Sequence, residues 1–245
     1  MITYAIPVCN ESVELKLLLR QLIPYLREGD DILIQGDEGN VTDDVISVIS
    51  SFLTDYDRIS YTEYPLNSDF AAFKNNLLKY VKNKWIFQID ADEIVSETLL
   101  GNIHWLLTEN PDINGYLLPR VNLVQGLTQE WVDRWGWNIS KGVVQQGDES
   151  TVGILTKYGI DIFNGSLKLV NFPDYQNRLF RTDRGIKWVN KVHEVLTTDQ
   201  PIENIRMPLP CSQDGRSASY EYCLFHVKKL DRQVKQNELY SKIIA

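Results

Sequence analysis

The sequence predicts an α/β fold whose first half forms a doubly wound, mostly parallel sheet. Short apolar runs alternate there with amphipathic helical patterns, and this order is typical of parallel sheets covered by helices on both faces. The predicted strands are 3–8, 31–35, 58–62 and 85–89, and the predicted helices between them are 12–26, 42–53 and 70–81. A last helix is predicted for 220–244.

The first predicted helix shows how these elements are recognised. Its apolar residues recur at helical spacing, at positions 15, 18, 19, 22, 23 and 26, which is the pattern of a helix that buries one face. Ser12 can cap its first turn. Pro24 predicts a break or a second short helix, because proline cannot continue the backbone hydrogen bonding.

The second half has a different character. From 117 to 170 the chain is rich in Gly, Trp and Gln, and only 128–134 shows a short helical pattern. We expect loops and small strands here. Trp131, Trp135 and Trp137 could fill a small core or offer a stacking surface for a sugar or base. In 220–244, Val227, Leu230 and Val234 would form the buried face of the helix.

The composition limits the class of protein to which the chain can belong. The chain has 245 residues, of which 43% are hydrophobic and 24% charged, as in ordinary globular proteins. No apolar run approaches the length of about 20 residues that spans a bilayer, and the N-terminus lacks a signal-peptide pattern. We therefore expect one continuous unit, 1–245, in the cytoplasm. The three cysteines have no zinc-ligand spacing.

Charge argues against a broad nucleic-acid surface, since the formal net charge is −8 and duplex binding depends on cationic contacts to phosphate. Two segments, 168–191 and 228–242, are nevertheless locally basic. They could hold a small polyanion, or they could be ordinary solvated faces.

The run 85–93 is the most informative stretch of the chain. An apolar strand ends there in three carboxylates, Asp90, Asp92 and Glu93. Ligands of open α/β sheets bind at the carboxyl ends of the strands, and hard cations such as Mg²⁺ prefer carboxylate oxygens. The run therefore favours metal-assisted phosphate chemistry, although an acidic turn without a metal has the same pattern.

Further motifs accompany this run in a consistent order, at 6–11, 35–43, 69–76, 171–181 and 188–194. Together with 85–93 they resemble glycosyltransferase family 2 enzymes with the GT-A fold. The later motifs are similar to the branch of lipopolysaccharide core glucosyltransferases and related phage enzymes. The resemblance implies a nucleotide-sugar-binding half, 1–115, and a loop-rich acceptor half, 116–245. It also places the protein in the cytoplasm of a bacterium or of a phage-infected host.

The resemblance assigns the metal ligands of a site for Mn²⁺ or Mg²⁺. Asp92 would bind the ion directly. Asp90 would hold the donor ribose or a metal-bound water, and His226 matches the position of a third ligand. As a lone histidine, His226 could equally be a packed or surface residue.

The donor is implied to be a nucleotide-sugar, with a UDP-sugar expected. Pro7, Asn10, Glu11 and Asp37 would frame the nucleoside, with Ala91 between the two motif aspartates. The loop after Asp37 is longer than the family pattern, which leaves the base open.

Three basic residues could contact phosphate. Lys74 occupies a position where the family commonly places Arg or Lys, and its alternative role is that of an exposed helix lysine. Arg178 and Arg181 could brace the diphosphate or the acceptor, or form a surface ladder on a strand.

The acceptor hydroxyl requires a general base on the side opposite the leaving group in an inverting transfer. Glu194 is the expected base, and His193 is the alternative because it titrates near neutrality. In an extended segment the two side chains point in opposite directions, so that only one could face the acceptor.

The segment 141–168 resembles an insertion relative to the family pattern, and it is predicted to form part of the acceptor site or a lid. The acceptor could be a glycan, a lipopolysaccharide core or a modified nucleic-acid base. Two other functions remain open at this stage. A nucleotidyltransferase shares paired acids on a doubly wound sheet, and a non-catalytic sugar- or partner-binding module could retain the fold.

Overall fold

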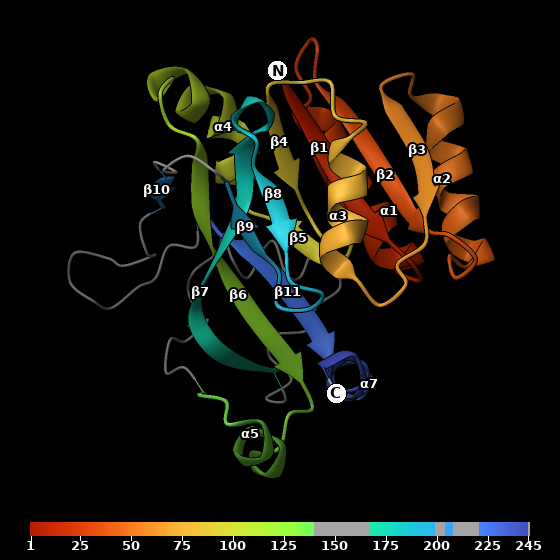
Figure 1. Cartoon of the computed structure of the whole chain (residues 1–245), viewed down its shortest axis with the longest axis vertical. Coiled ribbons are helices and arrows are strands. Elements are labelled where there is room, and N and C mark those ends of the chain that lie inside the picture. Colours follow the sequence, from red (N-terminus) through yellow and green to blue (C-terminus); the bar gives the residue numbers. More distant parts are fainter. Residues whose placement is uncertain (140–166, 199–203, 208–220, 245) are drawn as a thin grey trace.

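The computed structural model describes residues 1–139, 167–198, 204–207 and 221–244. A nine-stranded mixed sheet, ordered β3-β2-β1-β4-β7-β6-β11-β5 with β10 paired to β6, runs through both halves of the chain (Figure 1). Its strands are β1 (Ile2–Val8), β2 (Asp31–Asp37), β3 (Ile59–Tyr64), β4 (Trp85–Gln88), β5 (Glu93–Val95), β6 (Gly115–Gln125), β7 (Leu167–Arg181), β10 (Asn204–Arg206) and β11 (Leu224–Lys229).

The N-terminal half matches the predicted alternation of strands and helices. Strands β1 to β4 are parallel, and Tyr4 on β1 lies in register with Ile32 on β2 and Phe87 on β4. The chain turns after the first helix into a short 3-10 segment, Ile23–Tyr25, which contains Pro24. The predicted doubly wound, mostly parallel fold is therefore confirmed.

Helices cover the two faces of the sheet. The large core on one face joins it to α1 (Ser12–Leu22), α2 (Asp43–Asp55) and α4 (Glu97–Glu109). On the other face, α3 (Phe70–Leu78) and the hairpin of β8 (Lys187–Val189) and β9 (Val195–Thr197) pack through Ala71, Leu77 and Trp188 (Figure 1). The sequence patterns had not indicated α4, which begins at a Ser96 cap.

The second half contains longer strands than the sequence predicted. The 11 residues of β6 pair antiparallel with the 15 residues of β7, and β7 also pairs antiparallel with β4. The expectation of loops and small strands was wrong for these segments. Because β7 lies between β4 and β6, the sheet has no break between its two halves.

The predicted helix 220–244 is longer than the observed one, which has 15 residues. Residues Leu224–Lys229 form β11, which pairs parallel with β6 and antiparallel with β5. The helix α7 begins only at Leu230 and ends at Ile244. Pairing with two neighbouring strands supplies β11 with backbone hydrogen bonds that outweigh the local helical pattern. No helix in the described part of the chain is long and apolar enough to cross a membrane.

The three tryptophans pack together beside α5 (Gln129–Trp135). The ring centroids of Trp131 and Trp135 lie 4.8 Å apart, and those of Trp135 and Trp137 lie 4.7 Å apart. They adjoin a small core that includes Val132 and Val170. The tryptophans are partly buried and pack against this satellite core.

Candidate active site

The acidic motif lies directly after β4, at the carboxyl edge of the parallel strands. Glu93 begins β5, and β5 pairs antiparallel with β11 so that Glu93 is opposite His226. This pairing brings the C-terminal segment to the acidic motif, although well over a hundred residues separate the two in sequence. The predicted position of the carboxylates at a strand edge is what the structure shows.

Asp90 is held by basic residues from two other elements. Arg178 on β7 donates from Nη1 and Nη2 to the two carboxylate oxygens, at 3.2 and 2.5 Å. The Nζ of Lys74 on α3 lies 3.9 Å from the same carboxylate. Burial alone would raise the pKa of Asp90, but the charges of Arg178 and Lys74 lower it well below its usual value. Asp90 is therefore ionised and anchored.

Glu93 braces this arrangement from inside the protein. Its side chain is fully buried and accepts hydrogen bonds from Arg178 at 2.8 Å and Arg120 at 3.4 Å. Its other oxygen accepts the backbone N–H of Asp90 at 3.0 Å. A buried carboxylate of this kind orients the residues around it and leaves no face open to a ligand.

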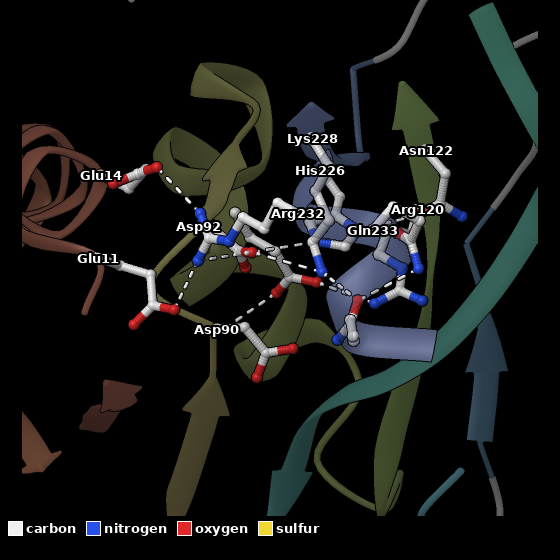
Figure 2. A network of polar contacts seen from close by, with 12 residues as sticks. Glu11, Glu14, Asp90, Asp92, Arg120, Asn122, His226, Lys228, Arg232 and Gln233 are labelled. Carbon is white, nitrogen blue, oxygen red and sulfur yellow. Dashed lines mark hydrogen bonds and ion pairs between the residues drawn. The ribbon is translucent and has the colours of Figure 1, made fainter. Parts of the chain in front are cut away.

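Asp92 faces a different set of side chains, all from the segment that contains β11 and the start of α7 (Figure 2). Its Oδ2 lies 3.3 Å from His226 Nε2, 3.6 Å from Lys228 Nζ and 3.7 Å from Arg232 Nη2. Burial would raise the pKa of Asp92, but these neighbours lower it well below the usual value. The two motif aspartates thus belong to separate groups of partners.

A hydrogen-bond chain fixes the orientation of the His226 ring. Asn122 on β6 donates through Nδ2 to Asp174 at 2.9 Å, so its Oδ1 is an acceptor, and His226 Nδ1 lies 3.1 Å from that oxygen. The proton therefore resides on Nδ1 when the ring is neutral. Burial and Lys228 lower the pKa of His226 despite the opposing effect of Asp92, which favours the neutral ring.

This donor set fits a divalent cation. The Nε2 lone pair of neutral His226 faces a carboxylate oxygen of Asp92, two acceptors that a cation would satisfy together. A carboxylate, an imidazole and an outer-shell partner on the other ring nitrogen form a common metal-binding arrangement. The described residues include no cluster of three or more His, Cys, Asp or Glu that could hold an ion.

Glu194 shares a basic partner with Asp90. Its carboxylate is 2.9 Å from Lys74 Nζ, which also lies over the ring of Trp188 at 4.9 Å. Lys74 is buried, so it is not the exposed helix lysine of the alternative interpretation. Lys74 links Glu194 to Asp90 across the site.

His193 does not share the environment of Glu194. Its φ of +54° interrupts the extended conformation that the sequence suggested for this segment. The residue is exposed, and its ring packs edge-on against Tyr240 on α7 at 5.6 Å. Glu194, with a side chain that is 12% exposed, is therefore the residue turned towards the acidic motif.

The predicted nucleoside-binding residues gather at the ends of β1 and β2. Glu11 accepts the backbone N–H groups of Cys9 at 2.8 Å and Asn10 at 3.0 Å, and so shapes the loop after β1. Asp37 is buried and accepts the N–H of Leu66 at 2.9 Å. Both carboxylates have internal partners. The remaining predicted residues of this group are half-buried Pro7, exposed Asn10 and buried Ala91.

Arg181 is not brought to this site. Its guanidinium pairs with Asp183 at 2.7 Å and donates to the carbonyl oxygen of Pro111 at 3.0 Å. It lies in register with Trp85 at the beginning of β4, whereas the acidic motif follows the end of β4. Arg178 lies at a register shift in the pairing of β7 with β6, between Asn177 and Leu179, and its contacts are those of the acidic motif.

Several site residues were not identified from the sequence. Arg120 and Asn122 come from β6, within the stretch 117–170 that had been expected to form loops and small strands, and Asp174 comes from β7. Lys228 and Arg232 lie in the basic segment 228–242. The charge pattern identified this segment as basic but could not show that it lies beside the acidic motif. The predicted insertion, 141–168, lies outside the described residues except for its last two, which begin β7.

The sequence matches a family model described as glycosyl transferase family 2 over residues 3–162. The chain belongs to glycosyl transferase family 2. The described sheet and helices agree with the GT-A fold of this family. No curated protein matches the sequence. The narrower resemblance to lipopolysaccharide core and phage enzymes stays a prediction.

Solved structures similar to this family 2 protein include S. aureus TarS. Residues 1–349 of TarS match with a TM-score of 0.44 and 11% identity, over 84% of this chain and 60% of that one. Mannosyltransferase PcManGT from Pyrobaculum calidifontis, in complex with GDP-Man and Mn²⁺, matches with a TM-score of 0.39 and 17% identity, over 52% and 35% of the two chains. The chain thus spans 60% or less of the length of these two structures.

Proposed function

We propose that the protein is a metal-dependent inverting glycosyltransferase that moves a sugar from a nucleotide-sugar to a hydroxyl acceptor by one in-line displacement. The observation that carries this proposal is the separation of the two motif aspartates. Asp92 faces the nitrogen of a histidine oriented for metal binding, and Asp90 is neutralised by Arg178 and Lys74.

Asp92 and His226 would hold Mn²⁺ or Mg²⁺ together with oxygens of the donor diphosphate. The ion supplies Lewis-acid stabilisation of the charge that develops on the leaving group. Asp90, fixed by Arg178, would accept a hydrogen bond from the donor ribose or from a metal-bound water. We take a UDP-sugar as the first donor to test, with Pro7, Asn10, Glu11 and Asp37 around the nucleoside.

Glu194 is the proposed general base. Its carboxylate lies within the site, close to Lys74, whereas His193 is exposed. Glu194 would accept the proton of the acceptor hydroxyl as the oxygen attacks the anomeric carbon. Lys74 would keep the carboxylate in place, and Arg178 would position Asp90 on the donor side.

The acceptor half supplies the remaining parts of the proposal. We propose that residues 1–245 act as one catalytic domain and that 141–168 contributes to the acceptor site. The acceptor would be a hydroxyl of a glycan, of a lipopolysaccharide core or of a modified nucleic-acid base.

The direct test is donor turnover with a panel of UDP- and GDP-sugars, measured as nucleoside diphosphate release with Mn²⁺, with Mg²⁺ and with EDTA. We expect metal-dependent release. Glu194→Gln should lower transfer by about 10²- to 10⁴-fold while nucleotide binding is kept, and the matched variant His193→Gln should remain active. Transfer by Glu194→Gln at the normal rate would contradict the assigned base.

Two outcomes would replace the proposal altogether. Release of pyrophosphate from a nucleoside triphosphate would indicate a nucleotidyltransferase. Binding of a nucleotide-sugar with no turnover in the presence of every acceptor class would indicate a binding module.

A further inference from the structure

Arg232 occupies a position between three carboxylates of two different regions. Its Nη2 lies 2.5 Å from Glu11 Oε1 and 3.7 Å from Asp92 Oδ2, and its Nη1 lies 3.1 Å from Glu14 Oε1 (Figure 2). Burial alone would lower the pKa of Arg232, but these carboxylates raise it. One guanidinium on α7 therefore connects the loop after β1 to the proposed metal ligand.

The position of Arg232 coincides with the path between the two ends of a nucleotide-sugar. Glu11 belongs to the loop that would frame the nucleoside, and its second oxygen holds the Cys9 and Asn10 amides of that loop. Asp92 would hold the metal. The group that joins a nucleoside to the metal-bound phosphate is the diphosphate, so the guanidinium lies where the diphosphate must pass.

We propose that Arg232 binds the donor diphosphate, exchanging its carboxylate partners for phosphate oxygens when the donor enters. This inference rests on the proposed function and adds a residue of α7 to the leaving-group site. A guanidinium presents a planar fork of N–H donors that fits two phosphate oxygens as well as it fits carboxylates. The Arg232 side chain is 33% exposed, so a ligand can reach it without unfolding of the site.

The exchange has a consequence that distinguishes it from a purely structural ion pair. If phosphate and carboxylate compete for the same guanidinium, then weakening a carboxylate partner should strengthen diphosphate binding. Glu14 is suited to this test because it lies on the outer part of α1 with a side chain that is 42% exposed. It has no part in the proposed donor or metal contacts.

The experiment is isothermal titration calorimetry of the full chain with UDP and UMP, and with GDP and GMP, in the presence of Mg²⁺. Arg232→Ala should weaken diphosphate binding by about tenfold, the effect of losing a charge-assisted hydrogen bond, and should change monophosphate binding much less. Glu14→Gln should tighten diphosphate binding by about two- to threefold, since exposed ion pairs are weak competitors.

The double variant and a charge control complete the design. Glu14→Gln in the Arg232→Ala background should give no tightening, because the competition needs the guanidinium. Lys235→Ala removes an exposed charge from the same helix and should leave both affinities within about twofold, as expected for a screened surface charge. Thermal unfolding of each variant would show whether it is folded.

The outcomes distinguish a failure of the proposed function from a failure of the role of Arg232. If the wild-type protein binds no nucleoside diphosphate, the proposed function fails. If it binds and turns over a donor, but Arg232→Ala keeps full diphosphate affinity or Glu14→Gln does not tighten it, only the role of Arg232 is overturned. If Arg232→Ala does not fold, the Glu14→Gln result alone decides, and an unchanged diphosphate affinity would reject the exchange.

Discussion

Arg178 holds Asp90 through both of its terminal nitrogens, at 3.2 and 2.5 Å, and the same Nη2 reaches Glu93 at 2.8 Å. One buried guanidinium thus neutralises two of the three carboxylates in the acidic motif. Asp92 is instead surrounded by His226, Lys228 and Arg232. Asp90 and Asp92 have different surroundings because Arg178 on β7 contacts Asp90, which follows the neighbouring strand β4.

Replacing Arg178 by Met should be strongly destabilising, because two buried carboxylates would lose their counter-charge. We expect a loss of about 3–5 kcal/mol in the free energy of unfolding, measured by denaturant titration. Arg181→Met is the matched control on the same strand. Its partner Asp183 is 47% exposed and can be solvated, so the expected loss is about 1 kcal/mol. Equal losses would contradict the assigned role of Arg178.

Asn122→Leu should weaken Mn²⁺ binding by about 10- to 100-fold. The substitution removes the acceptor that keeps the proton of His226 on Nδ1, and the ring would lose its fixed orientation towards Asp92. Titration of Mn²⁺ followed by electron paramagnetic resonance measures the change directly. Asn75→Leu, at the buried contact of α3 with Trp188, tests whether loss of any internal amide has the same effect, and we expect normal Mn²⁺ affinity.

Acid stability should depend on Asp30, whose carboxylate is buried beside His104 at 2.8 Å. Burial would raise the pKa of Asp30, but the hydrogen bonds from His104, Arg27 and Ile2 lower it below the ordinary value of 3.8. A lowered pKa in the folded state stabilises the fold above about pH 4, and that contribution is lost as the pH falls through the folded-state pKa.

Asp30→Asn should therefore cost about 1–3 kcal/mol at neutral pH, and the difference from wild type should shrink between about pH 5 and pH 2. Thermal unfolding as a function of pH gives both quantities. The exposed turn variant Asp57→Asn should show neither effect. A difference that stayed constant over the acid range would mean that the ionisation of Asp30 is not what stabilises the fold.

Trp135→Ala should reduce stability by about 2–4 kcal/mol, because Trp135 packs between Trp131 and Trp137 in the satellite core. Donor turnover without an acceptor should be unchanged once the variant is folded. A variant of normal stability that loses only transfer to a glycan acceptor would favour the stacking surface over the core.

The sequence predicted those features that depend on residues close together in the chain. Asp90, Asp92 and Glu93 follow a buried apolar strand, and the alternation of strands and helices before them requires that they lie at a sheet edge. The two-residue period of a strand does not separate Arg178 from Arg181, because the pairing of β7 with β6 shifts register at Arg178. Lys74 and Glu194 were found through the family motifs, and no local pattern predicts that they form an ion pair.

The parts of the site that could not be predicted depend on long-range pairing. His226 lies on a strand because β11 inserts between β6 and β5, whose residues are about a hundred positions away in the sequence. Read locally, the same residues continue a helical pattern. Arg120, Asn122 and Asp174 likewise form one group only because β6 and β7 pair.

The central position of β7 sets an order for synthesis of the protein. Strands β1 to β4 can assemble as the first ninety residues leave the ribosome, but the free edge of β4 stays open until Leu179–Arg181 arrive to pair with it. Open sheet edges promote association with other chains, and pairings that are distant in sequence form slowly. A nascent chain of this protein is therefore most vulnerable to aggregation while the stretch between β4 and β7 is being translated.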